Sequence, residues 1–210
     1  PTNGAIIENL RPSIKAVVLV EDGQIIPVSN IKFTFDGSNE IFEYNSETGE
    51  LVYTPAEELK ETPENFGKHT AKIEVMLPQL GTNKPPQVLQ DTLNFVAGKR
   101  PTISQFVYNN KYFEDPSKNP LLIGFVSDEG SGVDINSIVL SIDGENVSAD
   151  VLPSADFKNV QIFYTPKSNL SGGKHTARLF VKDLAGFHTS ESVEFTIEGA
   201  VLSVLKDSII

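Results

Sequence analysis

The sequence predicts an all-β protein made of two tandem antiparallel β-sandwiches with about seven strands each. Three observations predict this fold: a block of sequence recurs later in the chain, short apolar stretches repeat with a period of two, and turn residues separate these stretches. The composition agrees, because Val, Ile, Thr, Phe and Tyr favour strands and the chain holds 13 Phe and 5 Tyr. A chain of 210 residues accommodates two domains of about 100 residues, each able to bury its own core.

The repeat is the strongest of these observations. Residues 20–37 read VEDGQIIPVSNIKFTFDG and residues 127–144 read SDEGSGVDINSIVLSIDG, and they align without a gap at an offset of 107 (127 − 20). Three further pairs recur in the same order: VYTP and FYTP, GKHTAK and GKHTAR, LNFV and VEFT. A repeat of this length indicates duplicated domains rather than the short units of a solenoid.

The repeat divides the chain into three parts. We expect one sandwich over residues 1–98, whose first strand lies at the edge of the sequence and can be incomplete, and a second sandwich over residues 99–199. Residues 200–210, AVLSVLKDSII, form either a tail that adds an edge strand or the start of a further element. The first residue is Pro rather than Met, which indicates an excised fragment or a mature segment.

The second copy shows the strand pattern most clearly. Apolar runs or alternation predict seven strands: Thr102–Tyr108, Leu121–Val126, Ile138–Ile142, Val147–Leu152, Val160–Thr165, His175–Val181 and Val193–Ile197. Asp128–Asp134 and the Asp143–Gly144 dipeptide, which is typical of a two-residue hairpin, supply turns. The first copy follows the same plan, with a first strand at Gly4–Asn9 and a longer, proline-bearing loop at Met76–Gln90.

The order of these motifs resembles a known family. SDEGSGVDINSIVLSIDG, then FYTP, then LSGGKHTARLFVKDLAGF, is similar to the immunoglobulin-like repeats of bacterial secreted and cell-surface proteins. The resemblance covers the second copy and, more loosely, the first, which departs from it at Ile25–Pro27. It implies immunoglobulin-like sandwiches, an extracellular or cell-surface location in a bacterium, and a role as a spacer, stalk, adhesion or enzyme-accessory module.

Charge and composition exclude several classes of partner. The net charge is −11 and no run of four basic residues occurs, which argues against binding to nucleic acid. No stretch approaches the roughly 20 apolar residues of a membrane span. The absence of cysteine fits a cytosolic protein or a bacterial exported one. We therefore expect the partners to be other domains of the same polypeptide, a surface protein or a polysaccharide.

The sequence offers no catalytic constellation, and we expect no enzymatic activity. It has no Cys, no G-x-S-x-G motif and only three His. No sequence motif therefore indicates the nucleophile with an adjacent base that nucleophilic catalysis requires. His69 and His175 occupy equivalent positions after Gly-Lys, which indicates a shared structural task such as a hydrogen bond that caps a sheet end. His188 is expected to lie alone in a turn. No catalytic or cofactor-binding residue is assigned.

Calcium is the alternative to a purely structural acidic turn. Asp128, Glu129 and Asp134 offer the hard oxygen ligands that Ca²⁺ prefers. Their spacing does not match an EF-hand loop, and the first copy retains only Glu21 and Asp22. Hydrogen bonds from aspartates to nearby amides explain the same residues without an ion. We therefore assign no metal ligand and no cofactor.

Exposed aromatic side chains would be the signal for carbohydrate binding. Tyr108, Tyr112 and Phe113 cluster near the first loop of the second copy and are the candidates, with packing at the junction between the copies as the alternative. The sequence thus predicts a non-enzymatic structural or adhesive spacer pair of a bacterial extracellular or cell-surface protein. The alternative is an accessory carbohydrate-binding region of a secreted glycoside hydrolase.

Overall fold

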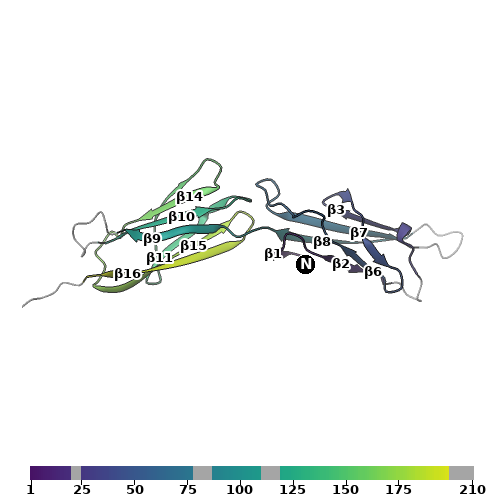
Figure 1. Ribbon diagram of the computed structural model, residues 1–210, viewed down its shortest axis with the longest axis horizontal. Helices are drawn as coiled ribbons and strands as arrows, with labels where there is room; N and C mark the ends of the chain where they lie inside the picture. Colours follow the sequence, from purple (N-terminus) through teal and green to yellow (C-terminus); the bar gives the residue numbers. More distant parts are fainter. Residues whose placement is uncertain (20–24, 78–86, 110–118, 199–210) are drawn as a thin grey trace, which may run out of the picture. The chain divides into compact units, whose positions relative to one another are not determined.

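A computed structural model describes residues 1–19, 25–77, 87–109 and 119–198 (Figure 1). Within these ranges the chain is all β apart from one short 3-10 turn, η2 (Val28–Asn30), and contains no helix long and apolar enough to cross a membrane. It divides into two compact units, Pro1–Lys99 and Arg100–Ile210. The expected class, two tandem immunoglobulin-like β-sandwiches, is confirmed.

The first unit consists of two sheets. One sheet contains, in spatial order, β1 (Ala5–Ile7), β8 (Val88–Ala97), β7 (Lys68–Met76), β3 (Ile31–Phe35) and β4 (Ser38–Asn39). The other contains β2 (Ile14–Val17), β6 (Glu50–Tyr53) and β5 (Glu43–Asn45). One pairing differs from the antiparallel pattern that the sequence predicts, because β1 runs parallel to β8.

The second unit also has two sheets. The first is ordered β13 (Asp150–Pro153), β14 (Asn159–Tyr164), β10 (Leu121–Ser127) and β9 (Thr102–Asn109). The second is ordered β12 (Glu145–Val147), β11 (Val133–Ile142), β15 (Gly173–Asp183) and β16 (His188–Ile197). All pairings in this unit are antiparallel among the described residues.

The alternation of side chains explains why these segments form strands. Along β15 every second residue is buried, from His175 through Leu179 to Asp183, while Thr176 and Arg178 are exposed. This period of two places one face of the sheet on the core and leaves the other to solvent. Each unit has its own core: aromatic in the first, where the rings of Phe33 and Tyr53 are 4.9 Å apart, and mostly aliphatic in the second.

The same hairpin occurs in both units. Asp36 and Gly37 connect β3 to β4 with φ angles of 48° and 82°, and Asp143 and Gly144 connect β11 to β12 with φ angles of 52° and 89°. Two successive residues with positive φ form the two-residue hairpin turn whose twist matches the strands, and Asp-Gly is among its preferred sequences. The hairpin predicted from Asp143–Gly144 is therefore present.

Candidate functional site

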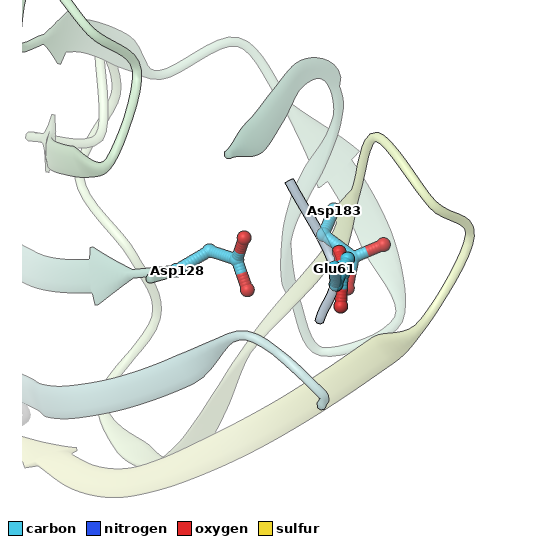
Figure 2. A group of neighbouring side chains, drawn as sticks. All are labelled: Glu61, Asp128 and Asp183. Carbon is cyan, nitrogen blue, oxygen red and sulfur yellow. The ribbon is translucent and has the colours of Figure 1, made fainter. Parts of the chain in front are cut away.

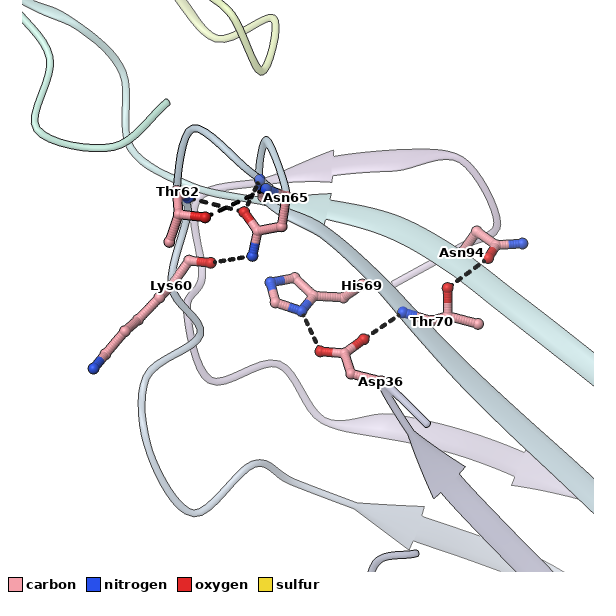
Figure 3. Close-up of polar contacts among 8 residues, drawn as sticks. Asp36, Lys60, Thr62, Asn65, His69, Thr70 and Asn94 are labelled. Atoms are coloured by element: carbon pink, nitrogen blue, oxygen red, sulfur yellow. Dashed lines mark hydrogen bonds and ion pairs between the residues drawn. The ribbon is translucent and has the colours of Figure 1, made fainter. Parts of the chain in front are cut away.

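A histidine–aspartate contact joins the hairpin of the first unit to its neighbouring strand (Figure 3). Nδ1 of His69 lies 2.7 Å from Oδ2 of Asp36, and the amide of Thr70 donates to Asp36 Oδ1 at 2.8 Å. The Asp36 amide donates in return to the Thr70 carbonyl at 2.9 Å. Because His69 occupies an inward position of β7, its ring is buried between those of Phe35 and Phe95, each with its centroid 5.7 Å away. The aspartate thus ties the turn to β7 through both of its carboxylate oxygens.

The second unit repeats this arrangement atom for atom. Nδ1 of His175 lies 2.7 Å from Oδ2 of Asp143, the Thr176 amide donates to Asp143 Oδ1 at 2.9 Å, and the Asp143 amide donates to the Thr176 carbonyl at 2.9 Å. His175 has one further bond, because Nε2 lies 2.8 Å from the Ser171 carbonyl. His69 Nε2 is buried and has no hydrogen-bond partner among the described residues.

These contacts set the ionisation of the second pair. A hydrogen bond to Asp143 raises the pKa of His175 above its ordinary value, and the Ser171 carbonyl adds to the increase. The bond from His175 lowers the pKa of Asp143, as does the Thr176 amide. With an acceptor at each ring nitrogen, the doubly protonated imidazolium satisfies both contacts, whereas a neutral ring donates only one proton.

The histidines are not placed to act as catalytic bases. Such a base must reach a substrate proton within hydrogen-bond distance. The ring of His69 is 5% exposed and that of His175 is 6% exposed, and Nε2 of His175 is occupied by Ser171. The shared structural task expected for the two histidines is what the structure contains, although the common partner is an aspartate side chain rather than the backbone.

Two buried carboxylates lie at one end of the second unit (Figure 2). Asp128 directly follows β10 and its Oδ2 accepts from the Gly132 amide at 2.7 Å. Asp183 is the last residue of β15, and its Oδ1 accepts from the amides of Gly186 at 2.7 Å and Phe187 at 2.9 Å. The side-chain oxygens of the two aspartates lie within 4.8 Å of one another. Each carboxylate therefore holds the turn that follows its own strand.

The set of acidic residues differs from the one suggested by sequence. Asp128 meets Asp183 and not Glu129, which is exposed, or Asp134, whose Oδ1 accepts from the Asn136 amide at 3.0 Å. Asp183 was not predicted, because it is 55 residues (183 − 128) from Asp128 and only the pairing of β11 with β15 brings them together. Two carboxylates supply fewer oxygens than the six to eight that Ca²⁺ takes. We therefore assign no ligand set to the second unit.

The other predicted positions are placed as follows. Tyr112, Phe113 and most of the Met76–Gln90 loop lie outside the described residues, as do Glu21 and Asp22. Tyr108 lies on β9 with its ring 5.6 Å from that of Phe195, so it packs against the core of its own unit. His188 does not lie in a turn: it begins β16 and pairs with Lys182, because the Asp183 carboxylate closes the turn at Phe187.

A surface hollow that the sequence did not predict lies on the outer face of the β12–β11–β15–β16 sheet. It measures about 660 Å³ and is lined by Phe180 and Val139, by Arg178, and by small polar side chains such as Ser141 and Asn146. The Arg178 guanidinium donates to Ser190 Oγ at 3.2 Å and forms no ion pair among the described residues. The hollow thus combines an aromatic ring, a cation and hydrogen-bonding groups.

The corresponding face of the first unit is a network of charges. The repeat aligns Lys32, Lys72 and Glu74 with Val139, Arg178 and Phe180. Lys72 Nζ lies 2.8 Å from Glu74 Oε1, and Lys32 Nζ lies 3.9 Å from Glu74 Oε2. The first unit therefore pairs its cations with a carboxylate, whereas the second unit presents an aromatic ring beside a guanidinium that forms no ion pair within the part of the chain that the structure describes.

No family model matches the sequence, and no curated protein matches it. Among solved structures, dimeric latent PorU from Porphyromonas gingivalis is 18% identical with a TM-score of 0.40, over 96% of this chain and 23% of that one. SGBP-B of the Bacteroides ovatus mixed-linkage glucan utilization locus, solved with a mixed-linkage heptasaccharide, is 16% identical with a TM-score of 0.32, over 92% and 42%. The protocadherin gammaB7 EC3-6 cis-dimer is 15% identical with a TM-score of 0.34, over 95% and 46%. This chain spans less than half the length of each of them, and the likenesses are distant.

Proposed function

We propose that this chain is a non-enzymatic structural or adhesive module pair of a bacterial extracellular or cell-surface protein. One observation carries the proposal: both units use the same set of bonds among an aspartate, a histidine and a threonine amide to fasten a hairpin to the core. Residues that have the same partners within both copies stabilise the fold that the copies share. The bacterial and extracellular part of the proposal rests on the resemblance of the repeat motifs.

The burial of the reactive groups supports the same proposal. His69, His175, Asp128 and Asp183 are each at most 6% exposed. The internal contacts described above hold these four side chains to hairpins and turns of their own units. Side chains engaged in this way stabilise a scaffold and do not present chemistry to a substrate. A scaffold of this kind would position the domains on either side of it.

Two experiments test the proposal: one locates the chain on the cell surface, and the other measures how the chain unfolds under force. An antibody raised against this chain should label intact cells of the source bacterium, and external protease should remove the label. In single-molecule pulling, the chain should unfold in two steps of similar length, one for each unit. Labelling only after lysis contradicts the extracellular role, and turnover of peptide, ester or glycoside substrates contradicts the non-enzymatic one.

The hollow around Phe180 supports a second candidate function, an accessory carbohydrate-binding region of a secreted glycoside hydrolase. An aromatic ring beside hydrogen-bonding side chains suits the apolar face and the hydroxyls of a sugar. On a glycan array, retention that Phe180→Ala abolishes would support this function. Leu152→Ala is the control, because Leu152 is 58% exposed on another sheet. Absence of retention by the unmodified chain would leave the structural role.

A further inference from the structure

An equivalent cation has different neighbours on the outer faces of the two units. In the first unit Glu74 Oε1 lies 2.8 Å from Lys72 Nζ. The repeat aligns Lys72 with Arg178. It aligns Glu74 with Phe180, and the strand order agrees, because β7 lies between β3 and β8 as β15 lies between β11 and β16. The second unit therefore retains the cation and has an aromatic ring where the first unit has the carboxylate that pairs with it.

Neutral side chains flank Arg178 on both neighbouring strands. Ser141 of β11 and Ser192 of β16 lie opposite it. The guanidinium donates to Ser190 Oγ at 3.2 Å, which uses one of its five N–H groups. These groups form a planar fork that matches the two oxygens of a carboxylate. Because Arg178 is exposed, its remaining donors are accessible to a ligand in the hollow.

The acidic residue that lines the hollow has other partners. Both oxygens of Asp143 are engaged: Oδ1 accepts from the Thr176 amide at 2.9 Å and Oδ2 lies 2.7 Å from His175 Nδ1. On β16, Glu194 lies opposite Thr176 rather than opposite Arg178. Neither carboxylate forms an ion pair with Arg178 within the part of the chain that the structure describes. The ion-pair position at Arg178 is therefore open to a carboxylate of a ligand.

An apolar surface lies beside this open position. Phe180 lies opposite Val139, which is 39% exposed, and the centroid of the His188 ring is 5.7 Å from that of Phe180. An aromatic ring suits the apolar face of a sugar. Phe180 and Arg178 are two residues apart on one face of β15, about 7 Å along the strand. A sugar ring over Phe180 therefore brings a carboxylate attached to that ring within reach of Arg178.

We propose that this hollow binds sugar residues that carry a carboxylate, the uronic acids of acidic polysaccharides. The carboxylate of the sugar pairs with Arg178, as the carboxylate of Glu74 pairs with Lys72 in the first unit. The sugar ring lies on Phe180, and the small polar side chains around it bind the sugar hydroxyls. This inference rests on the second candidate function, carbohydrate binding at the hollow, and specifies the class of sugar.

A matched pair of ligands tests the role of the carboxylate. The full chain is titrated with polygalacturonate, alginate and polyglucuronate, each as the acid form and as the methyl ester, which has the same sugar backbone without the charge. At least one acid form should bind about tenfold or more tightly than its ester, because hydrogen bonds between two charged groups are the stronger ones. Its binding should also weaken as salt is added, because Arg178 is exposed.

A matched set of variants tests the two side chains. Arg178→Gln should lower the affinity for the acid form about tenfold or more, and Arg178→Lys should lower it less, because Lys keeps the charge and loses the planar fork. The control is Lys72→Gln at the equivalent position of the first unit, which should bind as the unmodified chain does. If Arg178→Gln impairs folding, Arg178→Lys and the esterified ligands still decide the question.

Polyglutamate separates sugar recognition from charge alone, because it has carboxylates and no sugar ring. It should bind more weakly than the acid polysaccharide, and equal binding would overturn the inference. Equal affinity for an acid form and its ester, or an Arg178→Gln variant that binds as well as the unmodified chain, would overturn the inference and leave the second candidate function in place. A chain that binds no glycan, acidic or neutral, would contradict both and leave the structural role.

Discussion

His175 and Asp143 are held together by a 2.7 Å contact between Nδ1 and Oδ2, and the opposite ring nitrogen of His175 contacts the Ser171 carbonyl at 2.8 Å. The equivalent pair in the first unit, His69 and Asp36, has the first contact and not the second. Among the described residues, the two copies of this histidine–aspartate contact thus differ by the hydrogen bond at Nε2, so the effect of that bond can be measured within one molecule.

The stability of the second unit should depend on pH through this pair. The pKa of His175 is raised above its ordinary 6.5, so its contribution to stability is complete below that value and is lost as pH rises through the pKa of the folded state. The pKa of Asp143 is lowered from 3.8, so its contribution is present above that value and is lost as pH falls through the folded-state pKa. Stability from the pair should therefore be greatest between these two ordinary values.

Hydrogen exchange of the core amides of β15, measured from pH 5 to pH 9, checks this expectation. Protection should decrease toward the alkaline end of the range, and His175→Gln should remove most of that decrease. A variant with the same pH profile as the unmodified chain would assign the dependence to another group.

Replacement of the two histidines by phenylalanine should have unequal effects. His69→Phe loses one contact, to an aspartate whose side chain is 43% exposed, and places a ring among Phe35 and Phe95. His175→Phe loses two contacts and leaves the Ser171 carbonyl without its partner. We expect His175→Phe to cost about 1–2 kcal/mol more. Hydrogen exchange of core amides in each unit measures the loss of unfolding free energy caused by each variant. Equal losses would contradict the role given to Ser171.

Removal of the Asp183 carboxylate should destabilise the second unit. Asp183→Ala leaves the Phe187 amide without its acceptor and leaves the Gly186 amide only the Asp183 main-chain carbonyl at 3.3 Å, at a cost of about 1–3 kcal/mol. Asp183→Asn retains Oδ1 as an acceptor and should cost less than half as much. Chemical denaturation with a probe in the second unit compares the two. Equal losses would show that the charge, rather than the two hydrogen bonds, is what matters.

The glycines that precede the two histidines should respond differently to alanine. Gly67 has a φ of 66°, and an added Cβ would lie 2.5 Å from the Ala97 carbonyl oxygen, so the backbone must move. Gly173, at the equivalent position with a φ of 137°, has no atom within 4 Å of such a Cβ. Both variants suffer backbone strain, and only Gly67→Ala also has a steric clash. Melting of the two variants should therefore show a larger loss for the first unit.

The sequence predicted those features that depend on local pattern. Alternation located the strands, as along β15, and Asp143-Gly144 located a hairpin because few dipeptides accept two positive φ angles. The equivalence of His69 and His175 indicated a shared structural task before either partner was known. These predictions required no knowledge of which strands are neighbours.

Features that depend on strand pairing could not be predicted in the same way. Asp183 reaches Asp128 only through the sheet, and the hollow around Phe180 requires the register of β11 with β15. The parallel pairing of β1 with β8 has no local sequence signature. The incorrect placement of His188 arose from the turn before it, which ends at Phe187 because the Asp183 carboxylate accepts the amides of Gly186 and Phe187.

The link between each Asp-Gly hairpin and the strand beside it has a consequence for a chain with no cysteine. Small exported domains commonly use disulfides to staple distant segments together, and reductants break such staples. Here a histidine and an aspartate that are 33 residues apart in the first unit and 32 apart in the second join such segments without sulfur. The histidine–aspartate contact therefore forms in reducing and in oxidising surroundings alike. In the second unit its strength depends on pH and not on redox potential.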